Sequence, residues 1–442
     1  MSTIPINLQS HTENYIGLKK IGLSIFSIGF LFFLICFTSA TKFNPILFFF
    51  LSIGLSVIGG LIFFYAQYLS NPIAGVKKNG AMFMSVANKG LIGWMLAVFF
   101  TGFYVLLYWF PETLANVSMI FDWLSYNIRN LPSDQWFLYS ALYTIAVAIM
   151  GVRMIIHNRH NKYQIIRTIS VIFFQLVFAF IIPNILILLN EPGYYFSYFW
   201  PLKYDYLFPS NLEYLLNSKG HLAVFMFFWS TMMSFIAVPI LTYYFGKRWY
   251  CSWVCGCGAL AETLGDPFRH LSNKKLTAWK YERWIIHSVL AAIVLLTALL
   301  WINSYYKGGV LGEFSLSFSK VYGFVIGAAF AGVAGVGFYP LMGGRVWCRF
   351  GCPLAAVLGI LQKYFSRFRI TTNGAQCISC GNCSTYCEMG IDVKAYAQRG
   401  QNVIRSSCVG CGVCAEVCPR GVLKLENGPV KGRYELNEEY LR

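Results

Sequence analysis

The sequence predicts an α-helical integral membrane protein with about eight transmembrane helices, followed by a small C-terminal α+β domain rich in cysteine. Composition predicts the membrane class: apolar residues make up 57% of the 442 residues and charged residues only 12%. Soluble domains contain about 25% charged residues. Two closely spaced cysteine runs near the C-terminus predict the small domain.

Eight apolar stretches are long enough to cross a bilayer, which requires about 20 helical residues. They run approximately over residues 18–40, 45–69, 89–110, 135–157, 163–189, 220–245, 282–303 and 320–342. The first lacks the features of a cleaved signal peptide, so we expect a retained anchor. We assign residues 1–160 to about four N-terminal helices, 161–370 to a transmembrane core and 371–442 to the C-terminal domain.

The basic residues predict that both ends of the chain face the cytoplasm, from a multi-pass position in the cytoplasmic (inner) cell membrane. In this topology only six of the 35 Lys and Arg residues fall on outer loops, and basic residues near helix ends are retained inside. The net charge of +17 is then explained mainly by the basic residues that are kept on the inner side of the membrane. We therefore expect a lipid bilayer as partner and no nucleic acid, while an acidic docking partner stays open.

Residues 193–216, on an outer loop, are packed with Tyr, Phe, Trp and Pro. We expect this loop to lie at the membrane interface, as an aromatic belt does. The alternative is a lid over a quinone headgroup or a docking surface for an outer redox partner. In that case Glu191 and His221, at the adjoining helix ends, would handle protons.

The pattern G-x-R-x-aromatic-C-x3-C occurs twice, each time after a transmembrane helix, in a first copy (residues 246–260) and a second copy (residues 343–357). The alignment pairs Cys251 with Cys348, Cys255 with Cys352, and Arg248 with Arg345. Residues i and i+4 share a helix face, so each copy should present two thiols together. Two facing pairs predict one thiolate-ligated iron or iron-sulfur centre at the inner membrane surface.

The two arginines should favour the ionised thiols of this centre. Cys257 is an extra thiol that replaces or supplements one of the four, and the isolated Cys36 receives no role. The alternative interpretation is that the cysteines pack as small apolar side chains.

Two C-x2-C-x2-C-x3-C runs follow the second copy. In this spacing three thiolates bind one [4Fe-4S] cluster and the fourth binds the neighbouring cluster, so two [4Fe-4S] clusters are expected. One set of ligands is Cys377, Cys380, Cys383 and Cys418, and the other is Cys408, Cys411, Cys414 and Cys387. Structural zinc sites are the alternative. Pro419 follows the second run, whereas Glu388 follows the first.

The paired C-x3-C copies followed by the double run resemble the membrane polyferredoxins typified by NapH of nitrate respiration, NosR of nitrous-oxide respiration and CcoG of cytochrome oxidase assembly. The resemblance covers about residues 163–426. It implies a quinol dehydrogenase-like membrane electron carrier with cytoplasmic iron-sulfur clusters, which exchanges electrons with quinol or outer-face redox proteins. The first copy departs from the family pattern, because Gly256 stands where Pro is usual.

These features predict a membrane-bound iron-sulfur protein that relays electrons in a respiratory pathway. The relay would connect the quinone pool or an outer-face redox partner with the cytoplasmic side. Whether the chain is itself an oxidoreductase stays open. One alternative is a maturation factor that reduces a metal, most plausibly copper, for a respiratory enzyme. A redox sensor is a second alternative, although the sequence shows no DNA-binding or signalling module.

Reporter fusions test this topology. We expect fusions at Asp122, Tyr206 and Gly309 to report from the outer side and a fusion at Arg442 to report from the cytoplasm, because the basic loops are retained inside. An outward-facing C-terminus would overturn both the helix count and the proposed side of the clusters.

Overall fold

A computed structural model of the chain describes residues 15–69, 89–217, 221–307, 309–310, 312, 314–373 and 376–428. These residues contain eight helices long and apolar enough to cross a membrane, which confirms the predicted class. The first spanning helix is α2 (Ile16–Ile35). The second is made of α3 (Pro45–Phe49), η2 (Phe50–Gly54), α4 (Leu55–Phe64) and η3 (Tyr65–Leu69). The third is α6 (Leu91–Trp109) and the fourth is α9 (Gln135–His157).

The other four form the membrane core around the C-x3-C copies. The fifth is made of α10 (Lys162–Phe173), η6 (Phe174–Ile181) and α11 (Ile182–Leu188), and the sixth of α13 (His221–Met232), η8 (Met233–Ala237) and α14 (Val238–Phe245). The seventh is α17 (Leu276–Tyr305). The eighth is made of α18 (Phe314–Tyr322), η10 (Gly323–Ala334) and α19 (Gly335–Gly337). The seventh helix begins at Leu276, earlier than the apolar pattern predicted. Its added residues, 276–281, lead into Glu282, which is buried against Arg349 (3.1 Å).

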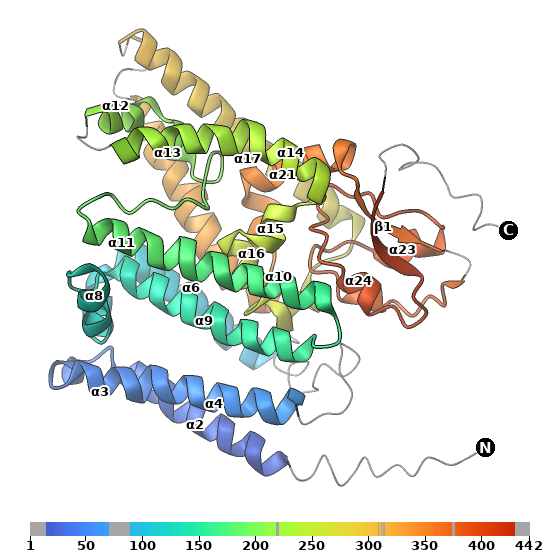
Figure 1. Cartoon of the computed structure of the whole chain (residues 1–442), viewed down its shortest axis with the longest axis horizontal. Helices are drawn as coiled ribbons and strands as arrows, with labels where there is room; N and C mark the ends of the chain where they lie inside the picture. The colour runs from blue at the N-terminus through green and yellow to red at the C-terminus, as the bar shows by residue number, and fades with distance from the viewer. Residues whose placement is uncertain are drawn as a thin grey trace.

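Short helices connect the spanning helices at both ends of the bundle. They are η1 (Ser39–Lys42), η5 (Pro111–Leu114), α7 (Ala115–Met119), α8 (Asp122–Arg129), η7 (Tyr204–Leu207), α12 (Pro209–Asn217), α15 (Trp249–Trp253), α16 (Gly256–Glu262), η9 (Asp266–Leu271), α20 (Tyr339–Met342), η11 (Trp347–Gly351) and α21 (Pro353–Phe365). In Figure 1 the labelled α8 and α12 lie at one end, and the cysteine-rich domain lies at the other.

The cysteine-rich domain (residues 368–427) contains a two-stranded antiparallel sheet, as an α+β domain requires. Strand β1 (Phe368–Thr372) pairs with β2 (Leu423–Asn427), with Ile370 opposite Leu425. Its helices are α22 (Asn382–Thr385), α23 (Val393–Gln398) and α24 (Val413–Glu416). Gly381 and Gly412 precede α22 and α24 with φ of 79° and 75°, so both cysteine runs make the same left-handed turn.

One continuous hydrophobic core joins the membrane helices to the cysteine-rich domain. It contains Cys251 and Leu358 from the membrane part and Val403 and Val409 from the domain. At the junction, α14 ends at Gly246 with φ of 63°, and a Cβ there would lie 2.0 Å from Cβ of Phe368. Only glycine fits this close approach, so the domain is packed directly against the end of a spanning helix.

Part of the aromatic outer loop packs inside the helix bundle, an arrangement that the sequence did not predict. Residues 190–208, here called the re-entrant segment, turn into the bundle, where Phe199 is completely buried. Irregular backbone inside a membrane protein requires hydrogen-bond donors for its carbonyls. Neighbouring helices supply them, as Trp229 Nε1 donates to Phe196 O (2.9 Å), Trp301 Nε1 to Leu207 O (2.8 Å) and Ser234 Oγ to Trp200 O (2.6 Å).

Glu191 and His221 are the two residues suggested for proton handling. Glu191 is half-buried at the start of the re-entrant segment. The side chain of His221 lies outside the described residues.

Candidate iron-sulfur sites

Both C-x3-C copies fold in the same way. In the first copy the short helix α15 carries Cys251, and Cys255 is the N-cap of α16. In the second copy η11 carries Cys348, and Cys352 is the N-cap of α21. The chain turn before each short helix is made by a glycine with positive φ, Gly246 or Gly343. The sequence repeat is therefore a structural repeat.

The two cysteines of one copy do not share a helix face, which corrects the prediction from i, i+4 spacing. Cys255 (ψ 135°) and Cys352 (ψ 113°) have extended backbone, so the helix breaks before each of them. Pro353 causes the break in the second copy, because proline disfavours a helical conformation at the preceding residue. At Gly256, in the first copy, a Cβ would lie 2.4 Å from Tyr198 Oη. The absence of a side chain at Gly256 therefore leaves room for Tyr198 of the re-entrant segment.

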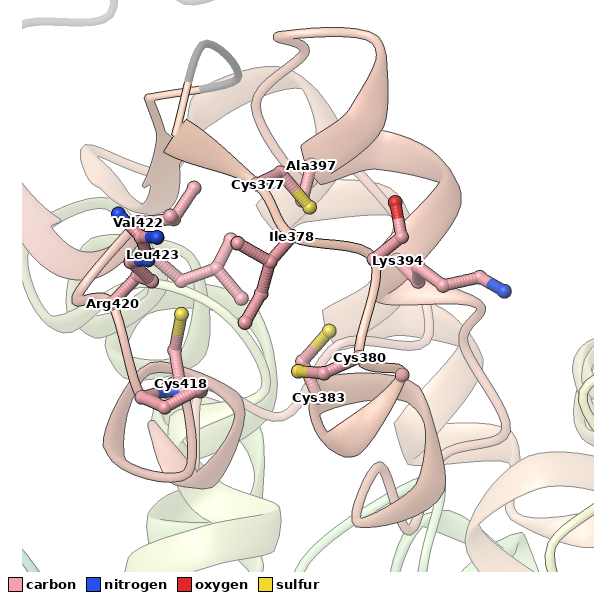
Figure 2. A pocket seen from close by; sticks show the side chains of 13 residues that line it. Cys377, Ile378, Cys380, Cys383, Lys394, Ala397, Cys418, Arg420, Val422 and Leu423 are labelled. Carbon is pink, nitrogen blue, oxygen red and sulfur yellow. The ribbon is translucent and has the colours of Figure 1, made fainter.

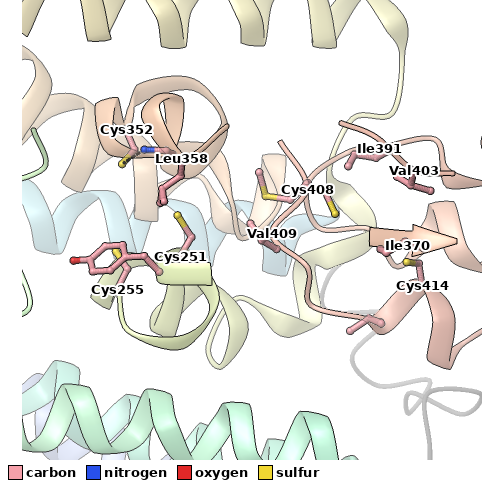
Figure 3. Close-up of a cluster of buried hydrophobic side chains, with 14 of the residues drawn as sticks. Cys251, Cys255, Cys352, Leu358, Ile370, Ile391, Val403, Cys408, Val409 and Cys414 are labelled. Carbon is pink, nitrogen blue, oxygen red and sulfur yellow. Dashed lines mark hydrogen bonds between the residues drawn. The ribbon is translucent and has the colours of Figure 1, made fainter. Parts of the chain in front are cut away.

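Two arginines connect the copies crosswise. Arg248 Nη1 donates to the backbone oxygen of Cys348 (2.9 Å), and Arg345 Nη1 donates to that of Cys251 (3.0 Å). Both arginines are buried, as are all four C-x3-C cysteines. Figure 3 shows Cys251, Cys255 and Cys352 in one buried region. The copies therefore face each other, as the four-thiolate prediction requires.

The thiols of this region influence one another electrostatically. Burial, followed by the neighbouring Cys348, Cys255 and Cys352, raises the pKa of Cys251 well above its ordinary value, and Arg248 opposes this rise. A hydrogen bond with Cys257 lowers the pKa of Cys255 to about 7. The arginine thus acts in the predicted direction, and Cys257 is a direct neighbour of the site.

The cysteine runs are brought together in the two predicted sets. Cys377, Cys380 and Cys383 of the first run and Cys418 of the second run line one hollow, shown in Figure 2. Three thiols from one run and the last thiol of the other thus surround one space. This is the crossed arrangement that the spacing predicts.

The second set lies deeper in the protein. Burial, followed by the neighbouring Cys411, raises the pKa of Cys387 to about 12. Burial and then Cys411, Cys408 and Cys387 raise the pKa of Cys414 well above its ordinary value. The four thiols are therefore mutual neighbours, although Cys387 comes from the other run.

The C-x3-C region and this deeper set are in direct contact. The backbone N–H of Arg248 donates to Cys408 O (3.4 Å), and Ser252 Oγ donates to Val409 O (3.1 Å). Figure 3 shows Cys251, Val409 and Cys414 along one stretch of the shared core. A single residue, Arg248, contacts cysteine backbone on both sides of this junction.

Buried charges that the sequence analysis did not identify hold the same junction. Glu388 accepts from Arg345 Nη2 (3.0 Å) and lies 3.2 Å from Arg269 Nη1. Glu262 lies between Arg345 (2.5 Å) and Arg167. All five side chains are buried. Glu388 is the residue that replaces the expected proline after the first run, and here it fastens the cysteine-rich domain to the second copy.

The charged network continues into the spanning helices. Asp266 pairs with Arg269 (2.5 Å) and with Arg153 of α9 (2.7 Å). Although burial acts to raise the pKa of Glu388, Arg269 and Arg345 hold it below its ordinary value. Burial likewise acts to raise the pKa of Asp266, but Arg153 and Arg269 hold it below its ordinary value. Glu388 and Asp266 are therefore ionised at neutral pH, and each compensates the charge of buried arginines.

The spacing of the thiols bears on the kind of metal that they can hold. Among the described residues, no group of three or more His, Cys, Asp or Glu side chains lies close enough to hold a single metal ion. A tetrahedral zinc ion with Zn–S of about 2.3 Å would place its sulfurs about 3.8 Å apart. In a [4Fe-4S] cluster, by contrast, each thiolate binds a different iron atom, so the sulfurs need not converge on one ion.

Comparison with known families supports iron-sulfur binding in both regions. A family described as "4Fe-4S binding domain" matches residues 227–276 and 324–372, and each match contains one C-x3-C copy. A family described as "4Fe-4S dicluster domain" matches residues 369–419. The prediction of 4Fe-4S binding is therefore confirmed, whereas the number of clusters and a separate centre at the C-x3-C copies stay predictions, and the zinc alternative is not supported.

Two curated proteins are similar to part of this chain. "Putative electron transport protein YccM" of Escherichia coli (strain K12) is 26% identical over 195 residues, which cover 42% of this chain and 53% of that protein. An uncharacterized protein of Methanocaldococcus jannaschii is 24% identical over 165 residues, 37% of this chain and 60% of its own length. The match thus spans little more than half of either relative. No solved structure matches the chain.

The variant Glu388→Gln tests the charged junction. Removal of one buried carboxylate leaves Arg345 and Arg269 undercompensated, which should destabilise the docked domain by about 3–5 kcal/mol. We expect the iron-sulfur absorbance to be lost at a lower temperature or denaturant concentration than in the wild type. Glu426→Gln, an exposed carboxylate of β2, is the matched control and should behave like the wild type. Equal stability of the two variants would refute the proposed role of Glu388.

Proposed function

The chain fits the membrane polyferredoxin family by its eight apolar helices and its 4Fe-4S domains, and from this premise we propose a respiratory electron relay. It transfers electrons between a donor or acceptor at the membrane, either quinone or an outer-face redox protein, and a partner on the side of the cysteine-rich domain. When bound, the iron-sulfur clusters supply the one-electron redox chemistry, and the protein sets their spacing, burial and potential.

We further propose that three groups of cysteines serve as cluster ligands. Two groups are the crossed sets of the cysteine runs, and the third is Cys251, Cys255, Cys348 and Cys352. The observation that carries this proposal is the crosswise pair of hydrogen bonds from Arg248 and Arg345, which holds the two C-x3-C copies face to face. Four buried thiols facing one another need a role beyond packing, because two matching copies converge on one place.

The exposure and contacts of the three cysteine groups indicate the order in which electrons would pass through them. Cys380 is exposed, and Ile378 beside it is 53% exposed, so the outermost group is open to a soluble partner. The deeper set follows, and Arg248 connects it to the C-x3-C region. A redox partner at the surface of the cysteine-rich domain can therefore approach the chain without entering the membrane.

The re-entrant segment favours access to the C-x3-C region from the opposite side. The rings of Phe199 and Tyr250 lie 5.1 Å apart, and Tyr250 Oη donates to Ser197 O. The segment therefore extends from the outer connection between spanning helices to the residue next to Cys251. This shortens the protein path between an outer-face or membrane-embedded redox partner and the cysteines.

The variants Cys251→Ser and Cys352→Ser test the relay. Full-length protein, reduced with limiting dithionite, is reconstituted in liposomes with or without menaquinone, and reoxidation of the iron-sulfur absorbance is followed. We expect menaquinone to accelerate reoxidation of the wild type and each variant to lose at least about tenfold of this acceleration, because a serine oxygen is a poor ligand for a soft centre. Cys36→Ser, another buried thiol, is the control and should retain the wild-type rate.

Two outcomes separate the parts of this proposal. Wild-type protein that menaquinone does not reoxidise would exclude quinone as the partner and leave the redox protein. Variants that keep the full rate would show that electrons bypass the C-x3-C cysteines. The whole chain is used in this test because residues from the C-x3-C region and the cysteine-rich domain share one core, so truncation before Gln376 would expose it.

A further inference from the structure

A hollow of about 620 Å³ lies outside the cysteine sites, where α17, α21 and the cysteine-rich domain meet. Its walls include Arg283 and Trp284 from α17, Lys363 and Tyr364 from α21, and Arg405 from the domain. The hollow is therefore shared between the membrane part and the domain. Nothing in the proposed relay uses these side chains.

The charged side chains that line the hollow are basic. Arg283, Lys363 and Arg405 line it together with His287, and no Asp or Glu of the described residues does. The guanidinium groups of Arg283 and Arg405 lie 4.3 Å and 4.0 Å from the ring centre of the same residue, Trp279. Neither arginine forms an ion pair with a described carboxylate, and the buried Nε of Arg405 has no hydrogen-bond partner in the described part of the chain.

Two cations gathered at one indole repel each other, and no carboxylate in the described part of the chain lines the hollow to compensate them. An anion placed among Arg283, Lys363 and Arg405 would remove this repulsion and would give Arg405 Nε an acceptor. A neutral ligand would leave both guanidinium groups uncompensated. The electrostatics therefore favour an anionic ligand over a quinone headgroup.

The position of the hollow indicates where this anion comes from. Trp284 is 74% exposed and Tyr364 51% exposed, on the outside of the bundle near the domain end of α17. Trp and Tyr are typical of the headgroup level of a membrane. The volume exceeds that of a phosphate ion and suits a headgroup with its glycerol. We propose that the hollow binds the phosphate of an anionic phospholipid such as phosphatidylglycerol.

A lipid bound in the hollow would connect the membrane part with the cysteine-rich domain. Its phosphate would contact Arg405 of the domain and Arg283 and Lys363 of the membrane part. Ser406, next to Arg405, accepts a hydrogen bond from Arg248 Nε (2.8 Å) through its backbone oxygen. The bound lipid therefore fixes the segment that leads from Arg248 to Cys408, and basic pockets of this kind at the membrane surface bind anionic headgroups.

Retention of phosphatidylglycerol tests the proposal. Full-length protein is reconstituted in phosphatidylcholine nanodiscs containing a small fraction of phosphatidylglycerol, released, and weighed by native mass spectrometry. We expect the wild type to retain phosphatidylglycerol and Arg283→Gln/Arg405→Gln to bind it about thirty-fold more weakly, equivalent to about 2 kcal/mol for two cations. Arg283→Lys/Arg405→Lys should retain most of it, because charge is preserved. Lys275→Gln, an exposed cation outside the hollow, should match the wild type.

The iron-sulfur absorbance reports whether each variant is folded. If the double variant loses it, Arg283→Gln alone, an exposed position, should still show about a fivefold loss of lipid. Unchanged retention in the folded glutamine variants, or an equal loss in Lys275→Gln, would overturn the proposal. Complete displacement by millimolar inorganic phosphate would instead identify a free-phosphate site. Displacement by menaquinone would identify a quinone site, and either result would also contradict the lipid assignment.

Discussion

The crossed hydrogen bonds of Arg248 and Arg345 join the two C-x3-C copies to each other and to the cysteine-rich domain. Each guanidinium is buried and donates to the cysteine backbone of the opposite C-x3-C copy. Each also reaches the cysteine-rich domain, Arg248 through Ser406 and Arg345 through Glu388. Because an unpaired buried guanidinium is very costly, the two copies and the domain can dock in only one way.

The buried ion pairs of this junction fix how the domain is placed on the membrane part more than they increase the free energy of unfolding. A buried ion pair roughly offsets its desolvation cost, whereas an incomplete one is strongly destabilising. The alternation of Glu262, Arg345, Glu388, Arg269 and Asp266 therefore penalises every misaligned arrangement of the domain. A fixed arrangement is what electron transfer between successive centres requires, and a hydrophobic interface alone would permit sliding. Charges buried at this junction would also influence the potential of any centre beside them.

The sequence predicted the parts of the protein whose signals are local. The length of each apolar run indicated the eight helices, and cysteine spacing indicated the crossed sets. The re-entrant segment was missed because Tyr, Phe and Trp are equally typical of a membrane interface. The break between Cys348 and Cys352 has a local signal, because Pro353 disfavours a helical conformation at the residue before it. The partners of Glu388 could not be predicted, because Arg269 and Arg345 are distant in sequence and only the fold brings them together.

We propose that the C-x3-C copies hold a centre of their own beside the clusters of the two cysteine runs. Iron content of the anaerobically purified full-length protein, with electron paramagnetic resonance during stepwise reduction, tests it most directly. We expect about twelve iron atoms per chain and signals from three interacting [4Fe-4S] clusters. About eight iron atoms and only two clusters, in protein whose cysteine runs are fully loaded, would contradict it.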